Sequence, residues 1–173
     1  MKGQDMDGSI QVYCGEGRGK TTAALGLGIR AAGVGKQVIM VQFLKRKHSD
    51  TLDFLKKLEP ELQIFRFEKA ACGYSDLSPE ERQEQFYNIK TALSYARKVL
   101  DTGQCDLLIL DEIFGLIDYD IISFDDLKNL IEVKNDTMDL ILTGRNLPEG
   151  MMEIADCVYS IHTEKEQSPE ILK

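Results

Sequence analysis

The sequence contains no tryptophan, only two histidines and only four cysteines. The cysteines are not arranged at metal-ligand spacing, so neither a zinc site nor a disulfide framework is expected. Histidine is also too scarce to favour a Ser-His-Asp catalytic arrangement. No apolar run approaches the roughly 18 residues of a membrane span, and residues 1–8 lack the apolar segment of a signal peptide. We therefore expect a cytoplasmic protein that does not enter the membrane.

Basic residues are also fewer than acidic residues. The chain has 21 Lys and Arg against 29 Asp and Glu, a formal net charge of -8. Binding to nucleic acid requires clustered basic residues, and the one dense cluster, Lys45-Arg46-Lys47, is interpreted as a solvated loop. We therefore expect no nucleic-acid partner. The length of 173 residues and the hydrophobic content of 43% favour a single globular domain spanning residues 1–173.

Short β-rich segments alternate with longer helical patterns along the chain. Residues 38–41, 107–110 and 140–142 are continuous apolar runs, which is typical of parallel strands covered on both faces. Helix starts are indicated at Ser78, with Pro79 and Glu81 behind it, and at Ser123, and a further helix is expected over residues 21–33. The pattern predicts a three-layer α/β fold with a mostly parallel sheet. The expected strands are residues 9–13, 37–42, 62–67, 105–110, 138–143 and 157–161.

A glycine-rich loop lies between the first expected strand and the first expected helix. Its sequence is Cys14-Gly15-Glu16-Gly17-Arg18-Gly19-Lys20-Thr21-Thr22, with Cys14 where the usual pattern has glycine. Such a loop turns its N–H groups toward phosphate oxygens, and the helix N-terminus adds partial positive charge. Lys20 supplies a point charge, and the Thr21 hydroxyl suits Mg²⁺. The motif predicts a P-loop NTPase (RecA-like) fold whose residues Gly15, Glu16, Gly17, Arg18, Gly19, Lys20, Thr21 and Thr22 bind ATP; the alternative is an ordinary glycine-rich turn.

Two acidic residues, Asp111 and Glu112, follow the apolar run 107–110. Because ligands of parallel sheets bind at the carboxyl ends of strands, both carboxylates are expected to face the P-loop. One of them would hold Mg²⁺ directly or through water. Glu112 is alternatively the general base of an ATPase or kinase, and both residues are alternatively solvated acids.

Arg145 follows another apolar run, within Thr143-Gly144-Arg145-Asn146. At the end of a parallel strand, its guanidinium group is expected on the ligand side, where it would contact phosphate oxygens. A salt bridge to a surface acid is the alternative interpretation.

Taken together, these segments resemble the ATP:corrinoid adenosyltransferases. The likeness covers residues 10–26, 30–36, 41–45, 110–112 and 143–148. The resemblance implies that the 5′-deoxyadenosyl group of ATP is transferred to Co(I) of a corrinoid, with release of tripolyphosphate. It implies Thr21 and Glu112 as Mg²⁺ ligands with Asp111 in support, and Arg30 near the ribose. Lys20 and Arg145 would then stabilise the leaving group as catalytic residues.

The resemblance also bears on the corrinoid and on partners. The family typically has a Gly-Phe-Thr-Trp segment beside the corrin, and the nearest match is Gly73-Tyr74-Ser75-Asp76. Tyr74 replaces the phenylalanine, whereas Asp76 stands in the tryptophan position; the basic tail usual in the family is also absent. The resemblance implies a homodimer and a flavoprotein reductant. A P-loop ATPase or kinase, or a catalytically silent ATP-binding relative, are the alternative functions.

Overall fold

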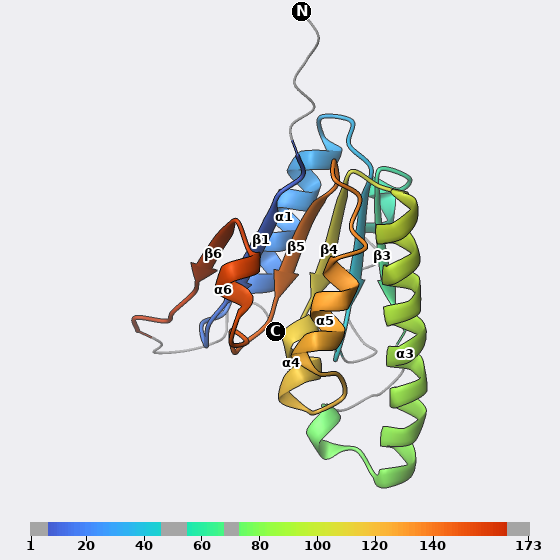
Figure 1. The fold of residues 1–173 in the computed structure, drawn as a ribbon, viewed down its shortest axis with the longest axis vertical. Helices are drawn as coiled ribbons and strands as arrows, with labels where there is room; N and C mark the ends of the chain where they lie inside the picture. The colour runs from blue at the N-terminus through green and yellow to red at the C-terminus, as the bar shows by residue number, and fades with distance from the viewer. Residues whose placement is uncertain (1–6, 46–54, 68–72, 166–173) are drawn as a thin grey trace, which may run out of the picture.

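The computed structural model describes residues 7–45, 55–67 and 73–165. These residues form an α/β fold around a six-stranded sheet with the strand order β3-β2-β4-β5-β1-β6 (Figure 1). Every pair of neighbouring strands in this described sheet is parallel. The prediction of an α/β fold with a largely parallel sheet is confirmed, and each expected strand is present. The strands are β1 Ile10–Cys14, β2 Val38–Gln42, β3 Leu62–Arg66, β4 Leu107–Asp111, β5 Asp139–Thr143 and β6 Cys157–Ser160.

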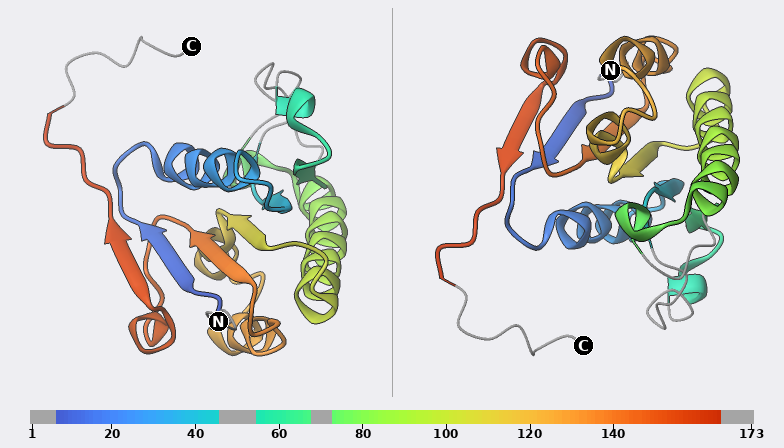
Figure 2. Two further views of the ribbon diagram at one scale, coloured as in Figure 1. Left: turned by 90° about the horizontal axis from the view of Figure 1, so that it is seen from above. Right: turned by 90° about the horizontal axis from the view of Figure 1, so that it is seen from below.

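Helices cover both faces of the sheet, but unequally. Helix α1, Lys20–Ala32, packs on one face, while the short helices α4, α5 and α6 lie on the other (Figure 2). The long helix α3 contributes to the same core as α5. The ranges are α3 Pro79–Thr102, α4 Ile113–Asp118, α5 Phe124–Ile131 and α6 Met151–Ile154, with single 3₁₀ turns at Lys56–Leu58 and Tyr74–Asp76. No helix in the described ranges is long and apolar enough to cross a membrane.

The strands β2 and β4 show why their sequences are continuously apolar. All five residues of each strand are buried, because alternate side chains enter the two different cores. Val38 and Met40 pack with α1, whereas Ile39 and Val41 pack with α3 and α5. Two-sided coverage of this kind produces the uninterrupted hydrophobic runs seen in parallel sheets.

The predicted helix starts are confirmed in detail. Ser78 and Ser123 each accept a hydrogen bond from the backbone N–H three residues later, and Glu81 and Asp126 complete the capping boxes. Helix α3 ends at Thr102, and Gly103 is its C-cap residue. Helix α4 was not predicted: it begins directly after Glu112, a residue with a positive φ of 62° and no side-chain cap, so its start carries no sequence signal.

The carboxyl ends of four central strands meet at one edge of the sheet. Gln42 pairs in register with Asp111, and Tyr13 pairs with Thr143 one residue before β1 ends at Cys14. The residues that leave these ends are the P-loop, Glu112 and the segment from Gly144 onward. The fold therefore assembles the predicted motifs at the edge where parallel sheets bind ligands.

Candidate active site

The P-loop connects β1 to α1, and its backbone is fixed from both sides. Gly15 donates its N–H to the Arg145 carbonyl oxygen at 2.8 Å, and Gly17 donates to the Ile161 carbonyl oxygen at 2.9 Å. Gly15 has a φ of 108°, and a Cβ atom there would lie 2.4 Å from the Ile161 oxygen. A side chain at this position is therefore excluded both by backbone conformation and by the close passage of the chain after β6.

The start of α1 has no capping side chain. Gly19, the N-cap residue, adopts the left-handed conformation and contributes no side-chain cap. The N–H groups of Lys20, Thr21 and Thr22 in the first turn thus lack a capping side chain and carry the partial positive charge of the helix. The Lys20 ammonium group donates to the Gly15 and Gly17 carbonyl oxygens at 2.6 and 2.8 Å, which holds it over the loop.

Asp111, at the end of β4, is the centre of a buried polar cluster. Its carboxylate is fully buried. It accepts hydrogen bonds from the Thr21 hydroxyl at 2.9 and 3.1 Å, from the Thr143 hydroxyl at 2.7 Å and from the Gln42 amide at 3.0 Å. Gln42 in turn accepts from Arg66 Nε at 2.7 Å, which fixes the orientation of its amide group. A buried charge needs such partners, and here they hold both oxygens in place.

Glu112 follows Asp111 but points elsewhere. Its backbone N–H donates to the Thr143 hydroxyl at 2.8 Å, so the same threonine supports both acidic residues. The Glu112 side chain lines the neighbouring pocket. The oxygen atoms of Thr21 and Asp111 lie together and fit a hard cation such as Mg²⁺. Here it is Asp111 that contacts Thr21 directly; the assignment of Glu112 as ligand and Asp111 as support stays a prediction.

Lys45 is a further member of the cluster. Its Nζ atom lies 3.4 Å from Asp111 Oδ2 and 3.2 Å from Thr21 Oγ1, and only 28% of its side chain is exposed. The interpretation of this lysine as part of a solvated loop is therefore wrong. The interpretation was wrong because Lys45 follows β2 closely enough for its side chain to reach Asp111 at the end of β4, which a run of basic residues in the sequence does not indicate. Arg46 and Lys47 lie outside the described residues.

A pocket of about 480 Å³ adjoins this cluster. Two aromatic side chains form part of its wall: the rings of Tyr74 and Tyr119 are 5.0 Å apart, centre to centre, and tilted by 50°. The guanidinium group of Arg82 lies 6.0 Å from the centre of the Tyr74 ring. Sequence reasoning missed Tyr119 because it follows α4, which was not predicted. The lining residues are Leu44, Lys45, Gly73, Tyr74, Ser75, Glu112, Gly115, Asp118, Tyr119, Arg145 and Asn146.

Arg145 combines the two roles that the sequence left open. It lines the pocket, and its Nε atom lies 3.4 Å from Glu16 Oε2. Both side chains are well exposed, at 63% and 72%, so the ion pair is weak and leaves the guanidinium group free to contact a ligand. Arg18, within the loop, and Thr22, in the first turn of α1, are exposed.

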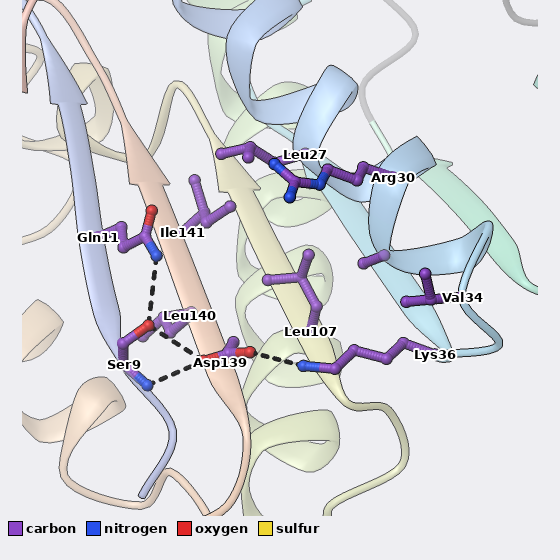
Figure 3. Close-up of a pocket in the computed structure, with 11 residues that line it drawn as sticks. Ser9, Gln11, Leu27, Arg30, Val34, Lys36, Leu107, Asp139, Leu140 and Ile141 are labelled. Atoms are coloured by element: carbon purple, nitrogen blue, oxygen red, sulfur yellow. Dashed lines mark hydrogen bonds and ion pairs between the residues drawn. The ribbon is translucent and has the colours of Figure 1, made fainter. Parts of the chain in front are cut away.

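Arg30 lies apart from these residues. It follows Lys20 by ten positions in α1, about 15 Å along the helix axis. Its side chain lines a second pocket, of about 310 Å³, together with Ser9, Lys36 and Asp139 (Figure 3). Ser9 and Asp139 lie at the beginnings of β1 and β5, away from the P-loop. The structure thus does not bring Arg30 together with the loop, and its role near a ribose stays a prediction.

The strand order, the glycine-rich loop and the buried acid at the end of β4 define a P-loop nucleotide-binding protein. Among solved structures, the KaiC-like protein PH0186 from Pyrococcus horikoshii OT3 superposes with a TM-score of 0.58. The superposition covers 93% of this chain and 75% of the Pyrococcus horikoshii protein at 18% sequence identity, so the likeness concerns the fold alone.

Sequence comparison shows to which family of P-loop proteins the chain belongs. The family model described as ATP:corrinoid adenosyltransferase BtuR/CobO/CobP matches residues 6–170. The corrinoid adenosyltransferase of Escherichia coli K12 is 30% identical over 162 residues, which cover 94% of this chain and 80% of that protein. The corrinoid adenosyltransferase CobA of Salmonella typhimurium is 28% identical with the same coverage. The chain belongs to the ATP:corrinoid adenosyltransferase family, and it is a transferase that acts on ATP and a corrinoid.

Proposed function

We propose that this chain transfers the 5′-deoxyadenosyl group of ATP to Co(I) of a corrinoid and releases tripolyphosphate. The observation that carries the proposal is a single pocket that has both charged and aromatic residues in its wall. The pocket beside the P-loop is lined by Lys45, Glu112 and Arg145 and also by the paired rings of Tyr74 and Tyr119. A triphosphate on the P-loop and a planar macrocycle against the tyrosine rings would therefore meet at this pocket, as transfer between them requires.

The reaction needs charge stabilisation rather than proton transfer. The electron pair of Co(I) forms the bond to C5′ while the bond from C5′ to the α-phosphate oxygen breaks, and that oxygen keeps the bonding electrons. Negative charge therefore accumulates on the tripolyphosphate. We expect Lys20, the first-turn N–H groups of α1 and Arg145 to stabilise it. No step requires a general base, so Glu112 has no role of that kind here.

Thr21, Asp111 and Glu112 would hold Mg²⁺, whose charge would lower the energy of the departing triphosphate. The fit rests on the Thr21 and Asp111 oxygen atoms, which lie within 2.9–3.1 Å of each other at a buried position. Thr143 and Gln42 orient the Asp111 carboxylate through hydrogen bonds.

The paired tyrosine rings are the proposed contact with the corrin. Arg82 donates to the Ser75 carbonyl oxygen at 2.8 Å and so anchors the turn that carries Tyr74. Asp76 is exposed, so its charge lies in water. On the basis of the family, we also propose that the protein forms a homodimer and is cytoplasmic. We propose that a flavoprotein reduces the corrinoid to Co(I).

Product analysis tests this function against its alternatives. The purified protein is incubated with Mg²⁺ and ATP, with and without chemically reduced cobalamin, and the phosphates and corrinoids are separated by chromatography. Adenosylated corrinoid and tripolyphosphate in equal amounts are expected. Orthophosphate formed without corrinoid, and lost in Glu112→Gln, would instead indicate a hydrolase. Bound but unchanged ATP would indicate a silent relative.

The corrin contact has its own test. Tyr74→Ala is expected to slow adenosylation of both cobalamin and cobinamide, which lacks the lower nucleotide ligand, because the ring pair is lost. Tyr74→Phe keeps the ring and serves as the matched control. MgATP affinity is measured alongside, and it is expected to stay unchanged in both variants. If Tyr74→Ala leaves every transfer rate as it was, this wall is not where the corrinoid binds.

A further inference from the structure

The side chain of Lys45 lies where a metal ion bound by Thr21 and Asp111 would need to be. Its Nζ atom is 3.2 Å from Thr21 Oγ1 and 3.4 Å from Asp111 Oδ2. Among the described residues, it is the cation that contacts the fully buried Asp111 carboxylate, whose other partners are neutral groups. The ammonium group thus neutralises a charge that burial alone would make unfavourable.

The backbone before Lys45 is held in place, whereas the Lys45 side chain is partly exposed. Phe43 is fully buried and donates its N–H to the Asp111 carbonyl oxygen at 2.9 Å. Leu44 adopts a positive φ of 55°, which turns the chain so that Lys45 reaches back across the end of β4. The Lys45 side chain also lines the 480 Å³ pocket that contains Arg145. Its ammonium group therefore has a second place to go without movement of the strand.

We propose that Lys45 is the resident cation of this site before nucleotide binds, that the metal displaces it, and that the displaced ammonium group then contacts the triphosphate. A divalent ion and an ammonium group repel each other strongly when both lie against one carboxylate. The metal consequently binds poorly while Lys45 is in place. ATP changes the balance, since its phosphates supply further metal ligands and a new partner for the lysine. Because of Lys45, the metal therefore binds together with the nucleotide and not before it.

This inference rests on the proposed nucleotide site, but its first test needs no nucleotide and no corrinoid. Mn²⁺, which shares the oxygen preference of Mg²⁺, is titrated into the protein and the free ion is measured by electron paramagnetic resonance. In Lys45→Met, Mn²⁺ is expected to bind about fivefold more tightly than in the wild-type protein because the competing charge is gone. Lys45→Arg keeps the charge and is expected to bind Mn²⁺ as weakly as the wild-type protein.

A matched control comes from the opposite end of the sheet. Lys36 forms an ion pair with Asp139 at 3.1 Å, at the amino end of β5, so Lys36→Met removes one lysine–aspartate pair without touching the site. It is expected to leave Mn²⁺ binding unchanged. Circular dichroism of each variant checks that the fold is kept. Mn²⁺ binding in Lys45→Met that is no tighter than in wild type would overturn the displacement.

The second arm measures MgATP affinity by calorimetry. Loss of a charge-assisted phosphate contact is expected to weaken MgATP binding about tenfold in Lys45→Met and not in Lys36→Met. Unchanged MgATP affinity would overturn the contact between Lys45 and the triphosphate. A wild-type protein that bound MgATP but transferred no adenosyl group would contradict the proposed function and leave this inference standing, so the two failures are distinguishable.

Discussion

Thr143 offers a sharp test of how the fold holds the two acidic residues. Its hydroxyl donates to Asp111 Oδ1 at 2.7 Å and accepts the Glu112 N–H at 2.8 Å, and the residue is fully buried. Thr143→Val keeps the shape of the side chain but removes both hydrogen bonds. A bond to a charged group contributes roughly 1.5–3 kcal/mol and a neutral one about 1 kcal/mol. We expect the free energy of unfolding to fall by roughly 2.5–4 kcal/mol.

The control is Thr143→Ser, which keeps the hydroxyl and loses one buried methyl group, at about 1 kcal/mol. Urea unfolding followed by circular dichroism measures both variants. Calorimetry then measures MgATP binding, which is expected to weaken about tenfold in Thr143→Val because Asp111 loses its fixed orientation. A valine variant as stable as the serine variant, with wild-type affinity for MgATP, would refute the claim that Thr143 positions these acids.

Three further outcomes are expected. Lys20→Ala weakens MgATP binding by one to two orders of magnitude in calorimetry, since a charge-assisted contact of roughly 1.5–3 kcal/mol is lost; wild-type affinity would contradict the P-loop assignment. Burial raises the pKa of the Cys105 thiol to about 12, so iodoacetamide modifies it at pH 8 far more slowly in the folded than in the urea-unfolded protein, as peptide mapping would show. Burial raises the pKa of Asp139, but hydrogen bonds from Ser9 and Lys36 outweigh it, so the net pKa is lowered. This carboxylate therefore stabilises the fold above its unfolded pKa of about 3.9. In urea unfolding, the stability difference between wild type and Asp139→Asn is expected in full at pH 7 and is expected to shrink as the pH falls below that unfolded value toward the lowered folded pKa; a constant difference would contradict it.

Most of the fold follows from local sequence signals. The buried strands were predicted because apolar side chains at every position are needed where helices cover both faces of a sheet. The starts of α3 and α5 were predicted because Ser78 and Ser123 supply capping side chains at fixed spacing. Helix α4 has no such signal: it begins at a left-handed Glu112, a conformation that only the surrounding structure imposes.

The site divides in a similar way. The P-loop and Asp111 could be predicted as site residues because they lie in contiguous sequence motifs. The supporting contacts of Gln42, Thr143 and Lys45 could not, because they depend on β2, β4 and β5 being neighbours in the sheet. One signal was available: Gln42 is a polar residue at the end of an otherwise apolar run. Arg30 matches the family pattern in sequence, but its side chain does not lie near the P-loop.

The central claim, transfer of the adenosyl group to cobalt, is tested most directly by following carbon C5′ itself. ATP labelled with ¹³C at C5′ is mixed with Mg²⁺, chemically reduced cobalamin and a stoichiometric amount of the protein, and the products are observed by ¹³C and ³¹P nuclear magnetic resonance. The account predicts that the labelled carbon becomes bonded to cobalt and that tripolyphosphate appears in equal amount. Label that remains in adenosine phosphates while orthophosphate accumulates would contradict it.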